Sequence, residues 1–222
     1  MKILCLSDKE CESLWDFYAP EKVAGYDIII ACGDLKAEYL SFLCTMCNIP
    51  VFYVPGNHDS SYEKYPPEGC ENIDGRIVSY KGLRLMGLGG SMKYTRGRYQ
   101  YTEEEMRRRI RRLSRKVRKA GGVDIIVTHA APAGYGDDAD PAHRGFTCFT
   151  AMLHEFRPKY LVHGHVHLTY GRHIQRIHQY EYTTIINAYE RYPLELDVPE
   201  TADVRKGFLS RLFPGRVSSG LR

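Results

Sequence analysis

The chain has 222 residues, of which 43% are hydrophobic, and a formal net charge of +4 at pH 7. This length is sufficient for one well-packed domain, and a second large domain is not expected. The small net charge does not by itself indicate a nucleic-acid partner, and no apolar run approaches the roughly 20 residues of a membrane span.

The start of the chain and its cysteines favour a cytoplasmic protein. Residues 3–6 form an apolar stretch that is too short for a signal peptide, and Asp8 follows where a small-residue cleavage site would be needed. The seven cysteines are an odd number, and a chain of this length does not need disulfides to be stable. We therefore expect reduced thiols, a cytoplasmic location and no membrane contact.

The first third of the chain alternates strand-like and helical patterns. Apolar runs at 2–7, 27–32 and 50–55 predict β-strands, and helical patterns at roughly 11–18 and 36–47 separate them. Apolar strands that are joined by helices are typical of a mostly parallel sheet covered on both faces.

Two later segments predict antiparallel hairpins. The short strand-like runs 76–80 and 83–88 meet around Lys81 and Gly82, a sequence suited to a tight turn. Residues 169–188 alternate polar with apolar or aromatic side chains, as a hairpin with one exposed face does.

The remaining elements complete the predicted domain. Residues 123–128 and 160–162 are typical of buried strands, which gives an α/β fold of two sheets with flanking helices in a single domain over 1–192. Residues 193–222 contain three prolines, scattered charges and a Ser-Ser-Gly sequence near the end. They predict a loosely packed tail, in which 204–213 could form one short helix.

The segment 106–119 reads MRRRIRRLSRKVRK and has two interpretations. In the first it is an amphipathic surface helix, capped by Thr102 and Glu105, whose basic side chains are solvated. In the second its basic face binds a polyanion. The apolar stripe that supports the first interpretation consists of Met106, Ile110, Leu113 and Val117.

Polar side chains with the chemistry of metal ligands directly follow several predicted strands. Because ligands gather beyond the carboxyl ends of strands in α/β sheets, these side chains can converge although they are distant in sequence. They are Asp8, Asp34, Asn57, His129, His165 and His167.

Carboxylates, an amide oxygen and imidazoles together suit manganese, iron, zinc or a similar first-row ion. Six ligands are too many for one tetrahedral centre, whereas two ions that share a bridging carboxylate would use them all. The sequence therefore predicts two divalent metal ions.

The order of these motifs resembles the calcineurin-like metallophosphoesterase family. The motifs are Asp8, Gly33-Asp34, Gly56-Asn57-His58-Asp59, His129 and Gly164-His165-Val166-His167, and they span residues 8–167. The resemblance implies an α/β/β/α double-sheet sandwich with a dinuclear metal centre that hydrolyses phosphate esters.

The resemblance also implies a role for each ligand. Asp8 and His167 would hold the first metal ion, and Asp34 would bridge the two ions. The second ion would be held by Asn57, His129 and His165. Manganese is the metal that we favour, with iron or zinc as alternatives.

In such a site a metal-bridging hydroxide attacks the phosphorus atom, and a histidine assists the leaving group. The matching residue is His58, and Asp59 resembles the aspartate that orients it. The carboxylate would help to keep His58 protonated.

Glu10 is the departure from the family pattern, which usually places a histidine there on the first metal ion. In an extended segment residues 8 and 10 point to the same side, so Glu10 could replace that histidine as an anionic ligand. Alternatively Glu10 does not bind, and the first metal site is weak.

The substrate is expected to be a phosphorylated small molecule or a nucleotide, contacted by His143, Arg144 or Arg96 from polar and glycine-rich loops. Two other functions remain as alternatives. One is a non-catalytic interaction module on the same fold, and the other is a nuclease that uses the basic 106–119 helix, although nucleic acid is not the favoured partner.

Overall fold

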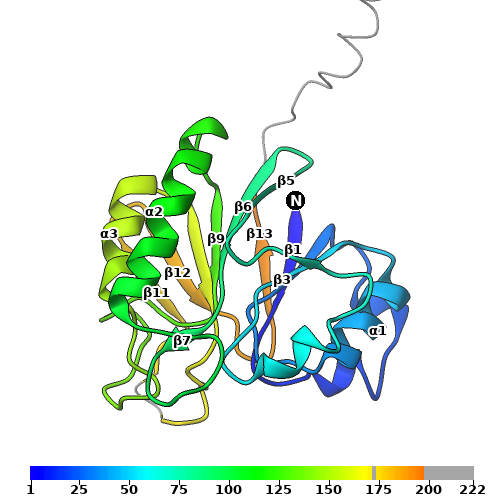
Figure 1. The fold of residues 1–222 in the computed structure, drawn as a ribbon. Helices are drawn as coiled ribbons and strands as arrows, with labels where there is room; N and C mark the ends of the chain where they lie inside the picture. Colours follow the sequence, from blue (N-terminus) through cyan, green and yellow to red (C-terminus); the bar gives the residue numbers. More distant parts are fainter. Residues whose placement is uncertain (172–173, 198–222) are drawn as a thin grey trace, which may run out of the picture.

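The computed structural model describes residues 1–171 and 174–197, which form two β-sheets with helices on their outer faces (Figure 1). The five-stranded sheet has the order β13-β1-β2-β3-β4, and the six-stranded sheet has the order β11-β12-β10-β9-β6-β5. Helix α1 covers one side of this pair of sheets, and α2 and α3 cover the other (Figure 1). The predicted α/β/β/α sandwich is confirmed.

The five-stranded sheet contains most of the N-terminal third of the chain. Its strands are β1 (Lys2–Leu6), β2 (Ile28–Ala31), β3 (Val51–Tyr53), β4 (Glu71–Asn72) and β13 (Tyr192–Glu195). All neighbours in it pair in parallel except β13, which is antiparallel to β1. Helix α1 (Ala37–Cys47) packs on the sheet through buried Tyr39, Leu40 and Leu43.

The six-stranded sheet has a parallel centre and an antiparallel hairpin at each edge. Its strands are β5 (Ile77–Tyr80), β6 (Leu83–Leu88), β9 (Ile125–Thr128), β10 (Tyr160–His163), β11 (Ile177–Tyr180) and β12 (Thr183–Asn187). Lys81 and Gly82 join β5 to β6 with φ angles of 46° and 85°, the positive values that a tight hairpin turn requires.

Helices α2 (Glu103–Lys119) and α3 (Thr147–Phe156) cover the outer face of this sheet. The predicted capping box of α2 is present, because Thr102 and Glu105 each bond the other's backbone N–H group. A small sheet of β7 (Ser91–Met92) and β8 (Gln100–Tyr101) precedes α2. Within the described ranges no helix is long and apolar enough to span a membrane.

The inner faces of the two sheets form a common core. Side chains alternate along each strand, so every second residue points to the opposite sheet. The buried residues between the sheets include Ile3, Cys5, Ile28, Ile30, Leu85, Ile125, Val127 and Val162. This packing fixes the carboxyl ends of the parallel strands relative to one another.

The helix predicted at 11–18 is not an α-helix. The segment forms a single 3₁₀ turn, Glu12–Leu14, and a second 3₁₀ turn follows at Pro20–Lys22. Leu14 is buried, but the side chain of Phe17 is 69% exposed. The apolar stripe therefore covers only one turn, which is too little to hold a longer helix on the sheet.

The domain also extends beyond the boundary predicted at residue 192. Strand β13 pairs with β1, and Leu194 and Leu196 are both 5% exposed. The alternation of these two leucines with polar residues is a strand pattern that the prolines nearby obscured. The short helix predicted at 204–213 lies outside the described residues.

Candidate metal centre

The six predicted ligands follow the carboxyl ends of five neighbouring strands, β1, β2, β3, β9 and β10. A cavity of about 450 Å³ lies there. It is lined by Asp8, Asp34, Asn57, His58, Tyr94, Ala142, His143, His165, His167 and Tyr170. His129 is fully buried and is not a lining residue, but its ring contacts the carboxylate of Asp34, which lines the cavity.

His129 is the centre of the tightest group of ligands. Its Nδ1–H donates to the carbonyl oxygen of Cys32 at 2.7 Å, so Nε2 carries the lone pair when the ring is neutral. Nε2 lies 3.2 Å from Oδ2 of Asp34 and 3.0 Å from Oδ1 of Asn57. Three atoms with lone pairs thus face one another, an arrangement that a cation satisfies.

The amide of Asn57 is oriented by a tyrosine that also lines the cavity. Nδ2 of Asn57 donates to the hydroxyl oxygen of Tyr94 at 3.2 Å. This bond leaves Oδ1, the atom suited to binding a metal ion, directed towards His129.

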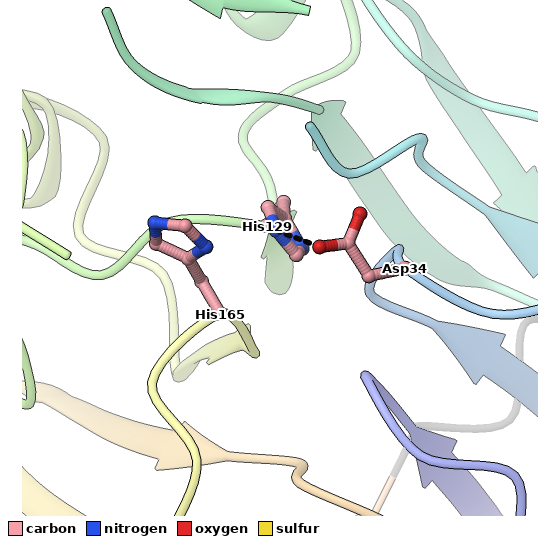
Figure 2. Close-up of side chains that lie close together, drawn as sticks. All are labelled: Asp34, His129 and His165. Atoms are coloured by element: carbon pink, nitrogen blue, oxygen red, sulfur yellow. Dashed lines mark ion pairs between the residues drawn. The ribbon is translucent and has the colours of Figure 1, made fainter. Parts of the chain in front are cut away.

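His165 presents its other ring nitrogen to the same group. Its Nε2–H donates to the carbonyl oxygen of Ala142 at 2.7 Å, and Figure 2 shows one ring nitrogen on the side of His129. One ligand atom each from Asp34, His129 and His165 lies within 4.8 Å of the others. These residues therefore fit a divalent metal ion.

The charges in this group are strongly coupled. Burial raises the pKa of Asp34, but the positive charge of His129 outweighs it and holds the pKa at about 2. Burial lowers the pKa of His129, yet the carboxylate of Asp34 raises it to about 9. Without a metal ion, a proton on Nε2 of His129 therefore takes the place of the cation between the ligands.

A second group of predicted ligands lies around Asp8, whose side chain is 1% exposed. Both of its carboxylate oxygens accept the backbone N–H of His165 at 2.9 Å, and Oδ1 lies 3.9 Å from Nε2 of His167. The ring of His167 stacks on Tyr170 with a centroid distance of 4.6 Å. Burial raises the pKa of Asp8 to about 6.

Three of the ligands have a left-handed backbone. The φ angles are 65° at Asp8, 54° at Asp34 and 70° at His165. Such angles are costly for residues other than glycine and are concentrated at functional sites. Here they turn the chain directly after a strand, so that each side chain points towards the cavity.

The glycines of the motifs make room for these side chains. A Cβ atom on Gly56 would overlap the carboxylate of Asp34, and one on Gly164 would overlap the hydroxyl of Ser7. Both positions therefore require glycine.

His58 lies at the exposed rim of the cavity. Its backbone N–H donates to Oδ1 of Asp34 at 2.9 Å. Asp59 accepts the backbone N–H groups of Asp34 at 2.8 Å and Gly56 at 2.7 Å. No hydrogen bond between the side chains of His58 and Asp59 is found in the described part of the chain. Asp59 therefore joins the loops of Asp34 and Gly56, which the sequence did not predict, and its role in orienting His58 stays a prediction.

Glu10 has a structural partner outside the cavity. It accepts the backbone N–H of Lys36 at 3.0 Å, at the beginning of α1. The predicted ligand role assumed an extended chain, but the left-handed Asp8 and a hydrogen bond of 2.7 Å from Lys9 N–H to the carbonyl of Ser7 form a turn. Glu10 is not among the residues that line the cavity, and its predicted role as a metal ligand stays a prediction.

A model of the calcineurin-like phosphoesterase family matches residues 1–168. The chain belongs to this family. Membership implies metal-dependent hydrolysis of a phosphate ester, and the chain is accordingly a hydrolase with a candidate metal site at Asp34, His129 and His165.

A solved structure shows the same fold in a distant protein. The protein TT1561 of Thermus thermophilus is similar with a TM-score of 0.60 and 16% identity, covering 85% of this chain and 89% of that one. The sulfate thiohydrolase SoxB of Thermus thermophilus has a TM-score of 0.42 and 13% identity, and the match covers 86% of this chain and 43% of SoxB. Among curated proteins none matches the chain.

The loops of this phosphoesterase contribute further residues to the cavity. His143 lines it, with its ring 5.0 Å from that of His165 and its Nδ1 2.7 Å from Oδ2 of Asp140. Arg96 and Arg144, the other two predicted substrate contacts, are exposed and are not among its lining residues.

Two tyrosines line the cavity: Tyr94, which ends the glycine-rich segment 87–94 expected to contact substrate, and Tyr170, which was not predicted as a site residue. A glycine-rich segment preceding Tyr94 was the only available signal for it. For Tyr170 the sequence carries no such signal, because its position depends on stacking against His167.

Proposed function

We propose that this phosphoesterase uses two divalent metal ions, with Mn²⁺ favoured over iron or zinc, to hydrolyse a phosphodiester or a phosphomonoester. The observation that carries the proposal is the position of Asp34 between two groups of ligands. Oδ2 of Asp34 lies 3.2 Å from Nε2 of His129 in one group, and in the other group burial and then the charge of Asp34 raise the pKa of Asp8. A carboxylate in such a position suits a bridge between two ions.

The ligands divide into two sets that share Asp34. The first set is Asp8, Asp34 and His167. The second set is Asp34, Asn57, His129 and His165. Because the second set is larger and its atoms are already close together, we expect the second ion to bind more tightly than the first.

Metal ions held there would supply Lewis-acid activation of the phosphate group and of a water molecule. Glu10 is bonded to the backbone of Lys36 and does not line the cavity, so we propose that only the carboxylates of Asp8 and Asp34 would oppose the charge of two divalent ions. About two formal positive charges would remain to bind the phosphate. Binding would also displace the proton from Nε2 of His129.

We assign to His58 the role of protonating the leaving group. Its ring lies at the exposed rim, while its backbone N–H is bonded to Asp34. This arrangement fixes the main chain of His58 beside the bridging carboxylate and leaves the ring on the side from which a substrate enters. A protonated imidazole in that position donates a proton to the departing oxygen.

The substrate is proposed to be a phosphorylated small molecule or a nucleotide. The cavity of about 450 Å³ is within the range of small-molecule sites, and Tyr94 and Tyr170 add aromatic surface to its walls. His143, oriented by Asp140, is placed to contact the part of the substrate beyond the phosphate.

The test is hydrolysis of p-nitrophenyl phosphate and bis-(p-nitrophenyl) phosphate by the Mn²⁺-loaded chain. We expect wild-type protein to hydrolyse at least one ester, and His58→Ala to lose about 10²- to 10⁴-fold in turnover while keeping its metal content. A matched control is His154→Ala, because His154 is exposed and pairs with Glu181 outside the cavity.

Two outcomes would contradict the proposal. Full activity of His58→Ala would show that His58 does not take part in catalysis. Hydrolysis of neither ester by metal-loaded wild type would favour the non-catalytic interaction module.

A further inference from the structure

The outward side of α2 carries an unusual density of positive charge. Six exposed basic residues lie in its last nine positions, and we call them the basic face. They are Arg111, Arg112, Arg115, Lys116, Arg118 and Lys119. In the part of the chain that the structure describes, no ion pair joins any of them to a carboxylate.

The orientation of the basic face is fixed by the packing of the helix. The apolar stripe of α2 is buried against the six-stranded sheet, with exposed fractions between 0% and 6%. At about 100° per residue, the basic residues centre on the side directly opposite that stripe. Figure 1 shows α2 on the outside of the molecule, so the basic face points to solvent.

The acidic residues of α2 are already engaged elsewhere. Glu103 accepts the backbone N–H groups of Thr147 and Cys148, at the beginning of α3. Glu104 pairs with Arg107, and Glu105 forms the capping box. None of these side chains therefore neutralises the basic face.

The spacing of the charges is unfavourable for an isolated helix. Arg111 and Arg115, Arg112 and Lys116, and Arg115 and Lys119 are each four residues apart, so like charges are neighbours on its surface. A bound polyanion would convert this repulsion into attraction.

We propose that the basic face binds the phosphate backbone of a nucleic-acid duplex. Four of its six residues are arginines, whose planar groups fork onto phosphate oxygens. The face has no aromatic side chain on which an unpaired base could stack, so a duplex is favoured over a single strand. Binding is expected to be independent of base sequence.

A membrane surface fits this helix less well. Helices that bind membranes insert an apolar face among the lipids, and the apolar face of α2 is occupied by the core of the protein. The large exposed hydrophobic side chains of the described residues, such as Phe17 and Tyr65, do not lie on α2.

The basic face is separate from the metal centre, because none of its residues lines the cavity. The inference thus goes beyond the proposed hydrolysis and does not depend on it. It assigns to α2 a docking surface for a macromolecule, whatever ester the cavity accepts.

The experiment measures the anisotropy of a fluorescent DNA duplex of about 20 base pairs, longer than the roughly 25 Å of α2, while the full chain is added. Wild type is compared with a variant that carries Arg111→Gln, Arg112→Gln and Arg115→Gln. The matched control carries Lys22→Gln, Lys36→Gln and Lys64→Gln, which removes three exposed charges that lie outside α2.

We expect wild-type affinity to fall by about 10³-fold between about 50 and 200 mM salt. The arginine variant should bind at least about tenfold more weakly at low salt. The slope of the logarithm of its binding constant against the logarithm of salt concentration should be smaller in magnitude by about three. The control should stay within about twofold of wild type. Thermal unfolding should show that the arginine variant is as stable as wild type, because it loses only like-charge neighbours.

Three results would overturn the proposal. The first is that the arginine variant binds the duplex as tightly as wild type. The second is that both triple variants lose the same amount of affinity for the duplex. The third is that the chain binds vesicles of anionic lipid but does not bind the duplex.

Discussion

The conformation of single residues decides which side chains reach the metal centre. Asp8, Asp34 and His165 all have positive φ angles directly after a strand, and all three point into the cluster. The sequence placed these residues correctly at strand ends, because apolar runs followed by polar residues are a clear pattern. It did not reveal their left-handed backbone, because aspartate and histidine, although enriched among non-glycine residues at such angles, adopt them at a minority of positions.

Glu10 illustrates this limit. A family pattern and an extended chain together predicted a metal ligand, whereas the turn at Asp8 directs Glu10 to the N-terminus of α1. The hydrogen bonds of Asp59 were likewise not predicted. His58, the neighbour of Asp59 in sequence, lies at the rim of the cavity. The side chain of Asp59 instead accepts hydrogen bonds from the backbone N–H groups of Asp34 and Gly56.

The predicted effect of Glu10→Ala is on stability. Loss of the hydrogen bond to Lys36 N–H should lower the free energy of unfolding by about 0.5 to 1 kcal/mol, while the number of bound metal ions stays the same. Chemical denaturation and metal analysis of the same sample measure both quantities. Glu21→Ala is the control, because Glu21 is exposed and follows Pro20 in a surface turn. If Glu10→Ala lost a metal ion and the Glu21→Ala control did not, Glu10 would be shown to be a metal ligand.

Among the elements, those with a long and regular pattern were predicted well. The capping box and four-residue apolar stripe of α2, and the turn residues between β5 and β6, specify their structures locally. The segment 11–18 and strand β13 were not predicted correctly. Each depends on a few contacts with distant parts of the chain, which local pattern does not contain.

Strand β13 is expected to be essential to the domain although it lies close to the predicted tail. Leu194 is 5% exposed in the core between the sheets, so Leu194→Ala should lower the free energy of unfolding by about 2 to 4 kcal/mol. Glu195→Ala is the control, because that side chain is 76% exposed and its ion pair with Lys2 contributes little. Equal stability of the two variants would show that β13 does not pack as described.

At the scale of the whole molecule, the two sheets contribute different chemistry to the metal centre. The proposed carboxylate and amide ligands Asp8, Asp34 and Asn57 follow strands of the five-stranded sheet. The imidazole ligands follow β9 and β10 of the six-stranded sheet, and they are His129, His165 and His167. Metal ions bound by both sets would join the sheets across the core and stabilise the folded state.

The most direct test of this account is the number of Mn²⁺ ions that the metal-free chain binds in a calorimetric titration. We predict two ions for wild type, with the second set of ligands filled first. His167→Ala should bind one ion, and Asp34→Ala should lose high-affinity binding of both, because only Asp34 belongs to both sets. A single ion in wild type, or two ions retained by Asp34→Ala, would contradict a dinuclear centre bridged by Asp34.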